Sequence, residues 1–450
     1  MRSLLAAALL AAFAAPCRAD VKLPTVFGDH MVLQRDKKLV VWGWAGLGEK
    51  VSVTFSGVTE NVAADAKGAW AVELPASKAN DKGQELVVKG EKNTVTIKDV
   101  LVGDVWVGSG QSNMEWSLRI SGDAKENIAA ADHPLIRLYH VPKVKAPKPE
   151  KDIKAAWKTC TPKNVPEFSA ALYHFGVALQ KELKVPIGLV NSSWGGSRIQ
   201  PWTVSDPDPK DKEYGQMYNA MIAPLRDFRV KGVIWYQGES NVGEAMRYRD
   251  RKEKLIKDWR RFWGDDLPFY FVQIAPFTYG GDAEMLPKFW EAQTACLKIP
   301  GTGMAVVTDA VHNVGDIHPR DKKTVGDRLA LWALAKAYGK KDVAYSGPLF
   351  KGAKFDGGKA VVSFAHAAGG LKARDGKALT TFELAGEDGK WHVAEAAIEG
   401  ETVAVTSKAV AAPVNVRFGW SKTANPNLIN KEGLPAGPFR SKDWQGGTGE

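Results

Sequence analysis

Ser112 lies in a short polar loop, residues 108–113, that directly follows the apolar run 102–107. Glycines in such a loop permit a tight turn. A serine that opens the next helix lies beside unpaired N–H groups and the positive end of the helix dipole. These features favour a serine nucleophile that attacks an acyl carbon. A serine that only caps the helix is the alternative.

His318 follows another apolar run, 304–308, and Asp316 precedes it by two positions. A histidine is the usual general base for a serine nucleophile, and a nearby carboxylate fixes its tautomer. Asp309 and His312, together with these two side chains, could instead hold a metal ion. Their spacing matches no pair of ligands on one helix, so the segment favours acid–base chemistry without a metal.

Two further polar blocks lie between these residues along the chain. Gly195 and Gly196 come after the run 187–191, and paired glycines let backbone N–H groups approach a ligand. Such groups suit an oxyanion hole, in which one donor is worth roughly 3–4 kcal/mol in the transition state. A turn that needs positive φ is the alternative. Residues 237–241, Gln-Gly-Glu-Ser-Asn, follow the run 232–236 and place polar groups at the end of a buried strand.

The elements that must position these residues alternate between strand and helix. Strands are predicted at 102–107, 187–191, 232–236, 269–274 and 304–308. Helices are predicted at 170–183, 246–262, 288–298 and 324–338. This alternation predicts a parallel sheet covered by helices. In such sheets sites form at the carboxyl ends of the strands, where all four polar blocks fall.

Short strand-like runs separated by Gly, Asp and Asn turns flank this region on both sides, which is typical of β-sandwiches. The predicted division is a signal peptide at 1–19, an N-terminal β domain at 20–100, an α/β domain at 101–340 and a C-terminal β domain at 341–450. The signal peptide is read from Arg2, the apolar run 4–15 and the small residues before Ala19. We therefore expect cleavage near Ala19 and a secreted or periplasmic protein.

The composition argues against two classes of protein, nucleic-acid-binding proteins and proteins that span a membrane. The net charge of +10 is spread among acidic residues, and no Lys/Arg block resembles a nucleic-acid arm. Outside the signal segment no apolar stretch approaches a transmembrane helix. The 16 tryptophans tilt the balance weakly towards a protein that binds sugars. Cys160 and Cys296 form no disulfide framework and lack zinc-type spacing, so two unpaired buried thiols are expected.

Three motifs, GQSNMEW, WYQGESN and DIHPRDK, carry a resemblance to a known family. Together with Gly196 they resemble the four sequence blocks of SGNH/GDSL hydrolases, and more narrowly the sialate O-acetylesterase family. The segments LPTVFGDHMVLQRD and RFGWSKTANPNLINKEGLPAGPFRSKDW also look like flanking segments of that family, so the resemblance covers nearly the whole mature chain. It implies a three-layer αβα catalytic domain flanked by β domains.

The resemblance also implies a deacetylase that needs no metal or organic cofactor. His318 would take the Ser112 proton, and the Ser112 and Gly196 N–H groups with the Gln237 amide would hold the oxyanion. Two positions depart from the usual pattern. The family often has its acid three residues before the histidine, where this chain has Gly315, so Asp316 is the expected acid and Glu239 its alternative. The third block usually supplies an Asn; in this chain Gln237 or Asn241 could serve.

Supporting or alternative roles are left to three side chains of the motifs: Gln111, Glu239 and Asn241. The expected partner is an acetylated carbohydrate, either a sialic acid or a polysaccharide such as acetylated xylan. The alternative that is not an enzyme is a carbohydrate-binding protein with a degenerate hydrolase core. Arg198 follows the Gly195-Gly196 turn, so it could bind the carboxylate of a sialic acid, unless it only pairs with a local acid.

Overall fold

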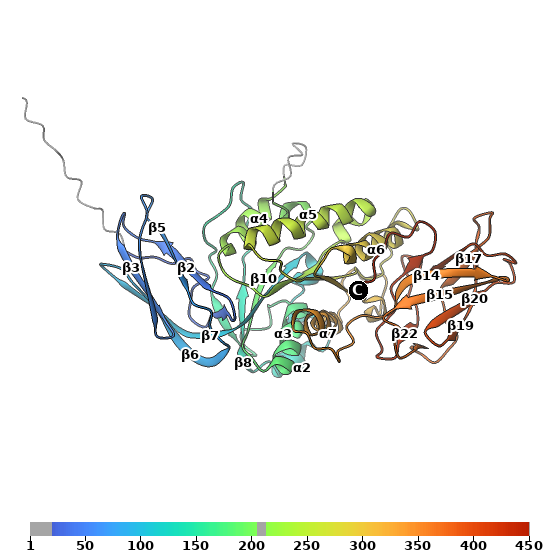
Figure 1. Cartoon of the computed structure of the whole chain (residues 1–450), viewed down its shortest axis with the longest axis horizontal. Helices are drawn as coiled ribbons and strands as arrows, with labels where there is room; N and C mark the ends of the chain where they lie inside the picture. The colour runs from blue at the N-terminus through green and yellow to red at the C-terminus, as the bar shows by residue number, and fades with distance from the viewer. Residues whose placement is uncertain (1–19, 205–212, 450) are drawn as a thin grey trace, which may run out of the picture.

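A mixed sheet forms the centre of the molecule in the computed structural model, which describes residues 20–204 and 213–449. Figure 1 shows three parts along the long axis: N-terminal strands, the sheet with its helices, and C-terminal strands. The sheet has the strand order β13-β12-β11-β7-β10-β8-β9. These strands span Thr302–Ala305 (β13), Phe269–Val272 (β12), Gly232–Tyr236 (β11), Thr94–Gly110 (β7), Ile187–Ser193 (β10), His133–His140 (β8) and Trp157–Cys160 (β9).

All neighbours in this sheet are parallel except β8 and β9, which pair antiparallel. Strands β10, β11, β12 and β13 are buried along their whole length because helices cover both faces, which explains their continuous apolar runs. The predicted α/β class is confirmed. Strands β8 and β9 were not predicted, because β8 mixes polar and apolar residues and β9 is a short strand at the edge of the sheet.

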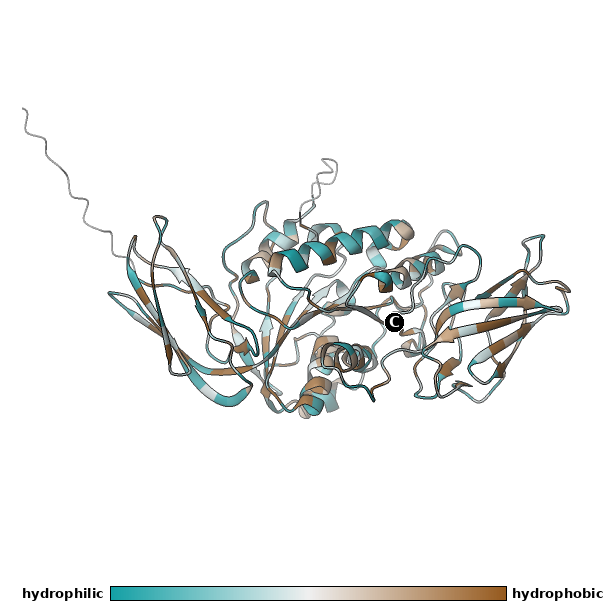
Figure 2. Cartoon of the chain, in the orientation of Figure 1, coloured by the Kyte–Doolittle hydropathy of each residue, from teal (hydrophilic) through white to brown (hydrophobic). Residues whose placement is uncertain are grey.

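The helices form one layer on each face (Figure 1). Helices α3 (Ala170–Leu183) and α7 (Lys322–Trp332) pack together on one face. Helices α5 (Met246–Trp263) and α6 (Met285–Ala295) cover the other, and Figure 2 shows a largely hydrophilic outward side on α5. Three short helices complete the set: α1 (Ser112–Glu115), α2 (Ala124–Ala129) and α4 (Gln216–Met221).

Side-chain caps start the two helices of the first layer. The Ser169 hydroxyl accepts a hydrogen bond from the Leu172 N–H at 3.2 Å, and the Asp321 carboxylate accepts from the Thr324 N–H at 2.9 Å. Each cap satisfies one of the N–H groups that a helix leaves unpaired at its start. The cap at Asp321 matters for the site because it fixes the start of α7 directly after the segment that carries His318.

The N-terminal strands continue into the central sheet. They are β1 (Val32–Gln34), β2 (Leu39–Trp44), β3 (Lys50–Phe55), β4 (Val58–Ala63), β5 (Ala69–Leu74) and β6 (Asn80–Lys89). Strand β7 begins among them, pairing with β6, and ends beside Ser112. One hydrophobic core runs from Val21 through the sheet to Leu349. The boundary expected at residue 101 therefore falls inside β7 rather than in a linker.

The C-terminal strands form small antiparallel sheets around a core of their own. They are β14 (Leu349–Asp356), β15 (Lys359–Ala365), β16 (Leu371–Ala373), β17 (Phe382–Ala385), β18 (Trp391–Val393), β19 (Glu395–Glu399), β20 (Thr402–Thr406), β21 (Asn415–Phe418), β22 (Leu428–Asn430) and β23 (Phe439–Arg440). Ion pairs join this part to α6: Arg417 with Glu284 at 3.0 Å, and Arg440 with Glu291 at 2.9 Å.

Cys160 and Cys296 are free and buried, as expected. The signal peptide predicted at 1–19 lies outside the described residues. Within residues 20–204 and 213–449 no helix is both long and apolar enough to cross a membrane.

Candidate active site

Strand β7 ends at the carboxyl edge of the sheet, and Ser112 follows it there. The strand ends at Gly110, whose φ of 136° belongs to the region that favours glycine. A Cβ at this position would lie 2.2 Å from the Tyr236 carbonyl oxygen, so no side chain fits between β7 and β11. The chain then turns directly into α1, and Ser112 is the first residue of that helix.

The predicted nucleophile and base meet. The Nε2 atom of His318 lies 2.9 Å from the Ser112 Oγ, although the two residues are distant in sequence. Burial lowers the pKa of His318, and the nearby Lys322 ammonium lowers it further, while Asp316 opposes this. The ring is therefore neutral near pH 7, which is the form that can take a proton from the serine hydroxyl.

Asp316 does not form the expected hydrogen bond with the histidine ring. Its Oδ1 lies 4.0 Å from His318 Nδ1 and instead accepts a hydrogen bond from the backbone N–H of His318 at 2.9 Å. The carboxylate is 41% exposed, so water screens its charge. The ring stacks on the Trp116 indole, with centroids 4.6 Å apart and planes inclined by 19°. The stack on Trp116 thus orients the His318 ring, and the Asp316 contact holds the backbone that carries it.

Two buried side chains hold the peptide segment on either side of His318. The Asn113 Nδ2 donates to the Ile317 carbonyl at 3.0 Å, and the Lys322 Nζ donates to the Pro319 carbonyl. The Lys322 Nζ also donates to the Asn113 Oδ1 at 2.7 Å, which joins the two clamps. Because Asn113 directly follows Ser112, the same pair fixes the base relative to the nucleophile.

Glu239, the alternative acid, completes this buried network and does not contact the histidine ring. Its Oε1 accepts from the Asn113 Nδ2 at 2.6 Å. Burial raises the pKa of Glu239, although the hydrogen bond from Asn113 opposes the shift. Burial also lowers the pKa of Lys322 to about 7, with Glu239 opposing that change. The network therefore carries two ionisable groups directly behind the nucleophile.

Two backbone N–H groups beside Ser112 are available to a developing oxyanion. Neither the Ser112 N–H nor the Gly196 N–H donates to any group in the described part of the chain. Gly196 has φ of 73° and open space around it, and its carbonyl accepts from the Ser240 hydroxyl at 3.1 Å. The Gly195 N–H, in contrast, donates to the Glu115 carboxylate, which holds the turn against α1.

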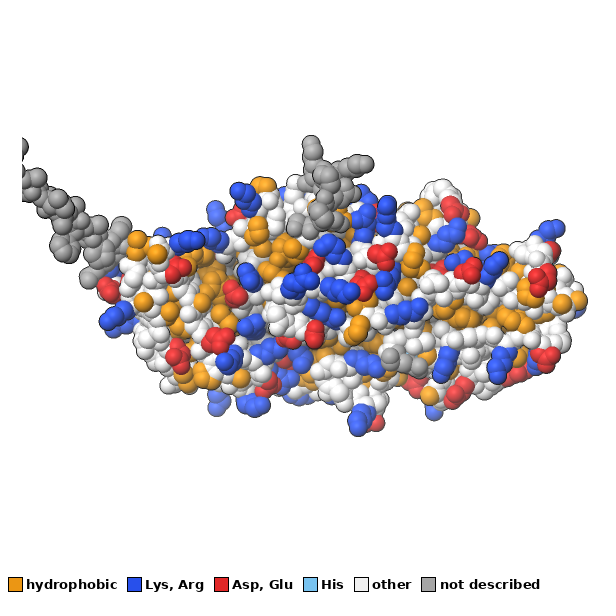
Figure 3. Space-filling view, turned by 45° about the horizontal axis from the view of Figure 1, so that its top comes forward, with side chains coloured by type: hydrophobic (Ala, Val, Ile, Leu, Met, Phe, Trp, Pro, Cys, Tyr) orange, Lys and Arg blue, Asp and Glu red, His pale blue; other side chains and the backbone are white. Residues whose placement is uncertain are grey.

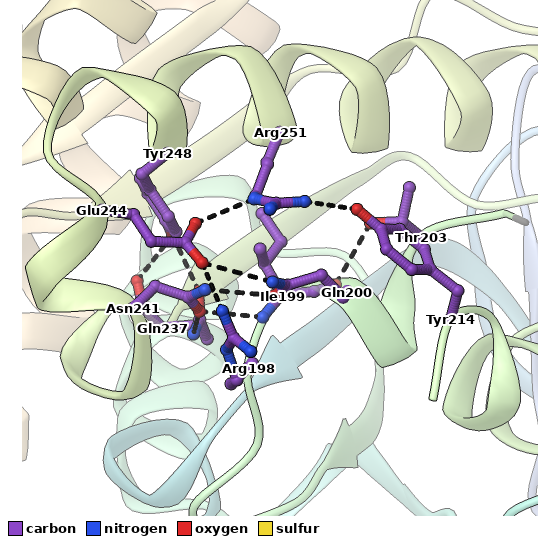
Figure 4. Close-up of polar contacts among 10 residues, drawn as sticks. All are labelled: Arg198, Ile199, Gln200, Thr203, Tyr214, Gln237, Asn241, Glu244, Tyr248 and Arg251. Carbon is purple, nitrogen blue, oxygen red and sulfur yellow. Dashed lines mark hydrogen bonds and ion pairs between the residues drawn. The ribbon is translucent and has the colours of Figure 1, made fainter. Parts of the chain in front are cut away.

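The Gln237 amide does not have the oxyanion geometry expected of it. It is fully buried, and its Nε2 donates to Gln111 Oε1 at 3.1 Å, to the Ser197 carbonyl at 3.2 Å and to Asn241 Oδ1 at 2.7 Å. Its Oε1 accepts from the Tyr248 hydroxyl at 2.9 Å. With its amide hydrogens committed in this way, Gln237 joins the segments that carry Gln111 and Ser197 to its own. Figure 4 shows its contacts with Asn241 and Tyr248.

Asn241 and Gln111 belong to the same scaffold. The Asn241 Oδ1 accepts from the Ile199 N–H at 2.9 Å, and its Nδ2 donates to Gln200 Oε1 at 3.0 Å. The Gln111 Oε1 also accepts from the Ser240 N–H at 3.3 Å. This orients the Gln111 amide nitrogen away from the scaffold.

Comparison with known proteins agrees with this geometry. Residues 102–335 match the family described as carbohydrate esterases, sialic acid-specific acetylesterases. The chain belongs to this family. It is 31% identical to sialate O-acetylesterase from Mus musculus over 403 residues, which cover 72% of this chain and 74% of the relative. The Homo sapiens sialate O-acetylesterase is 31% identical over 382 residues, which cover 73% of each chain. A carbohydrate acetylesterase structure from Xanthomonas citri has 44% identity and a TM-score of 0.91, covering 94% of this chain and all of the other.

Cations and aromatic rings lie along the rim of the esterase site. Lys143 pairs with the Glu115 carboxylate that holds the Gly195 N–H. Lys145 lies over the half-buried Trp194 ring, with Nζ 5.7 Å from the centroid. Lys145 also pairs with Glu213 at 3.1 Å, so each of these two lysines has a carboxylate partner.

Arg198 is the third cation of the rim. Its guanidinium is 47% exposed and pairs with Glu244, whose other oxygen accepts from Arg251 Nε at 2.8 Å (Figure 4). The local acid expected as the alternative partner is thus present. One carboxylate serves two arginines, however, so the cluster keeps a net positive charge.

The side chains considered as metal ligands, those of Asp309, His312, Asp316 and His318, do not gather around one point. Asp309 forms a bidentate ion pair with Arg328 at 2.6 and 2.7 Å, and His312 is exposed to solvent. In the part of the chain that the structure describes, no group of three or more His, Cys, Asp or Glu side chains could hold a metal ion.

Sequence reasoning missed three residues that position the base: Asn113, Trp116 and Lys322. Two of them lie in the GQSNMEW motif, where only Gln111 and Ser112 were given roles. The available signal was their closeness to Ser112: Asn113 follows it in α1, and Trp116 is the residue at which α1 ends. Lys322 gave no signal, because a lysine in a charged segment, DKK, looks like a solvated helix start.

Proposed function

We propose that this esterase removes O-acetyl groups from sialic acids, with Ser112 as nucleophile and His318 as general base. The observation that carries the proposal is the 2.9 Å contact between Ser112 Oγ and His318 Nε2 at the carboxyl edge of the sheet. A neutral imidazole in this position can accept the hydroxyl proton as the oxygen attacks. This contact also argues against a binding protein with a degenerate core.

The proposed reaction has two stages. Ser112 Oγ attacks the acetyl carbonyl while His318 accepts its proton, and the Ser112 and Gly196 N–H groups hold the oxyanion. His318 then gives the proton to the departing sugar oxygen, which leaves an acetyl-serine. A water molecule, deprotonated by His318, attacks this ester, and His318 then returns the proton to Ser112 Oγ as acetate leaves. Every step uses side chains and N–H groups of this chain.

The net positive cluster of Arg198, Arg251 and Glu244 supports sialic acid as the substrate class. A sialic acid carries a carboxylate, whereas acetylated xylose units do not. The exposed guanidinium of Arg198 belongs to the residue two positions after Gly196, which carries one of the two oxyanion donors. Arginine can bind a carboxylate through two parallel hydrogen bonds, so Arg198 is the proposed contact. The names of the Mus musculus and Homo sapiens relatives point to the same substrate.

A comparison of two natural substrates tests the proposal. The purified enzyme is given O-acetylated sialic acid and acetylated xylan at matched acetyl concentrations, and released acetate is measured. We expect faster release from the sialic acid, and none above background with the Ser112→Ala variant. Faster release from xylan would overturn the substrate class but keep the esterase. Equal release by wild type and Ser112→Ala would overturn the assigned nucleophile.

We also propose that the protein is exported after cleavage near Ala19, on the strength of the charged start and apolar run in residues 1–19. Expression of the full chain in a bacterial host, followed by N-terminal sequencing of the periplasmic fraction, tests this. A mature chain beginning at Asp20 is expected; an intact cytoplasmic chain would contradict it.

A further inference from the structure

A cavity of about 680 Å³ lies between the N-terminal strands and the helical layer, away from Ser112. One wall is formed by β2 and β5, and the other by residues around α4 and the end of α5. Arg226 and Asp227 line it just before β11 begins, whereas the opposite end of β11 contacts Gly110 beside the nucleophile. A molecule in this cavity is therefore on the other edge of the sheet from the reacting ester.

Two tryptophans present their rings on the cavity side of β2. Trp42 and Trp44 alternate with buried residues, so they share one face, and both are half-buried. Their partners directly across on β5 are alanines, Ala71 and Ala69, which are exposed and line the same cavity. A small residue opposite each indole leaves the ring uncovered. Side chains directly across from each other on one face of a sheet normally pack together. Alanine covers little of the ring opposite, so the aromatic surface of both tryptophans stays open.

The hydrophobic core supports this aromatic wall of the cavity from behind. Trp42 packs edge-on against Phe27, with centroids 4.6 Å apart, and so is anchored in the core. Trp70 lies between Ala69 and Ala71 on β5, so its indole is on the opposite, buried face of the strand, against Gly43. Its Nε1 is buried as well, so Trp70 supports the wall from behind and offers no donor to the cavity.

The ionisable groups of the lining nearly balance. Three carboxylates, from Asp65, Glu150 and Asp227, face two cations, from Lys151 and Arg226. Such a mixed set offers donors and acceptors to hydroxyl groups, and its slight negative excess disfavours an anionic ligand. This differs from the net positive cluster of Arg198, Arg251 and Glu244 near the active site. The two sites of one molecule thus select different chemistry.

We propose that this cavity binds a neutral pyranose sugar of a glycan chain, stacked on Trp44 and Trp42. The hydrophobic face of a pyranose ring packs on an indole, and its hydroxyl groups reach the charged side chains around the cavity. In Figure 3 hydrophobic side chains gather at the junction between the N-terminal strands and the helical layer, with Lys, Arg, Asp and Glu around them. The site would hold glycan while the acetylated residue reacts at the other edge of the sheet.

Titration of neutral sugars into the full-length Ser112→Ala variant tests the proposal without turnover. The probes are lactose and xylohexaose, with the methyl glycoside of sialic acid as the anionic comparison, and binding is measured by calorimetry. Two variants on this background target the cavity: Trp44→Ala removes the platform, and Ala71→Trp fills the space from an exposed position. Trp391→Ala, a half-buried tryptophan of β18 in the C-terminal part, is the matched control.

We expect at least one neutral probe to bind with a Kd of about 1 mM and each cavity variant to weaken it by about tenfold or more. The control should bind as the parent does. In the Ser112 background, turnover of p-nitrophenyl acetate by Trp44→Ala and Ala71→Trp should stay within about twofold of wild type. Melting temperatures identify a variant that fails to fold, and Ala71→Trp keeps the test decisive if Trp44→Ala does so.

No binding of either neutral probe would overturn the proposal, as would binding that survives Ala71→Trp. An equal loss in Trp391→Ala would place the sugar elsewhere and overturn it too. Binding of the sialic acid glycoside that Ala71→Trp abolishes would overturn the choice of a neutral ligand. None of these results depends on which acetylated substrate the active site prefers, so failure here is distinguishable from failure of the proposed function.

Discussion

The imidazole of His318 lies nearly parallel to the indole of Trp116, with ring centroids 4.6 Å apart. The indole N–H donates to the Ile120 carbonyl at 3.1 Å, which fixes the indole in turn. A flat surface under the imidazole restricts its rotation and keeps Nε2 directed at Ser112 Oγ. This stack supplies part of the orientation that a hydrogen-bonded carboxylate supplies in other serine hydrolases.

Trp116→Ala should therefore lower kcat by about tenfold, since a stacked aromatic pair contributes roughly 0.5–1.5 kcal/mol beyond the area it buries. Trp116→Phe keeps a ring and should recover most of the activity. Steady-state kinetics with p-nitrophenyl acetate separate the two constants. A rise in KM with kcat unchanged would mean that Trp116 contacts substrate instead of orienting the base.

Ser112→Ala should abolish esterase activity, by at least about 10³-fold, and leave the melting temperature nearly unchanged. The side chain lies at the site surface, and its removal leaves no buried group without a partner. Acetate release and a thermal unfolding curve measure the two effects. A serine-directed phosphonate should label the wild type at Ser112 and not the variant; label at another serine would assign the nucleophile elsewhere.

The pH profile should report the electrostatics around His318. Its pKa is lowered, so kcat/KM should rise with pH and level off with a midpoint below about 6.5. The Lys322 charge contributes to this lowering, and Asp316 opposes it. Lys322→Met should therefore move the midpoint to higher pH, and Asp316→Asn should move it to lower pH. Shifts in the same direction for both variants would contradict this account.

Asp316→Asn should cost only about fivefold to tenfold in kcat. A charge 4.0 Å from the ring and open to water contributes about 1 kcal/mol, whereas loss of a hydrogen-bonded triad acid costs about 10⁴-fold. Glu239→Gln should cost less than Asp316→Asn, because the Gln carbonyl can still accept from Asn113 Nδ2. Rates of both variants with p-nitrophenyl acetate check this order. A 10⁴-fold loss in Asp316→Asn would show that the carboxylate reaches the ring during catalysis.

Arg198→Ala should raise the KM for acetylated sialic acid by about tenfold and leave p-nitrophenyl acetate turnover nearly unchanged. The expected effect is moderate because the guanidinium is 47% exposed and shared with Glu244. Arg198→Lys keeps the charge but loses the two parallel donors, so an intermediate KM is expected. Equal losses on both substrates would mean that Arg198 supports the Gly195-Gly196 turn rather than the sugar carboxylate.

Sequence patterns were most informative where burial is complete. The run 232–236 and the helix 170–183 were placed with their observed bounds, because a strand covered on both faces leaves a continuous apolar run and a capped helix leaves a clear start. Strand β9 was missed, because it is short and mixes buried with exposed residues at the edge of the sheet. Such a strand is specified by its neighbour rather than by its own pattern.

The chemistry of the site could be predicted only for residues whose type suggests a role. Ser112 and His318 were paired because nucleophile and base are recognisable by kind and by position after strands. Gln237 was given the wrong geometry, since sequence does not show that Tyr248 and Asn241 consume its amide. Lys322 was not considered, because no local pattern shows that a lysine will be enclosed between Asn113 and Pro319.

The length of β7 limits how this enzyme can be taken apart. This strand, Thr94–Gly110, pairs with β6 at its start and ends two residues before Ser112. Trimming the chain at residue 101 would remove the half of that strand that anchors the rest. We expect such a fragment to be recovered as aggregate, and a graft of the catalytic region onto another protein to require the strands before it. The N-terminal strands and the catalytic region must therefore be kept together in any engineered version of this enzyme.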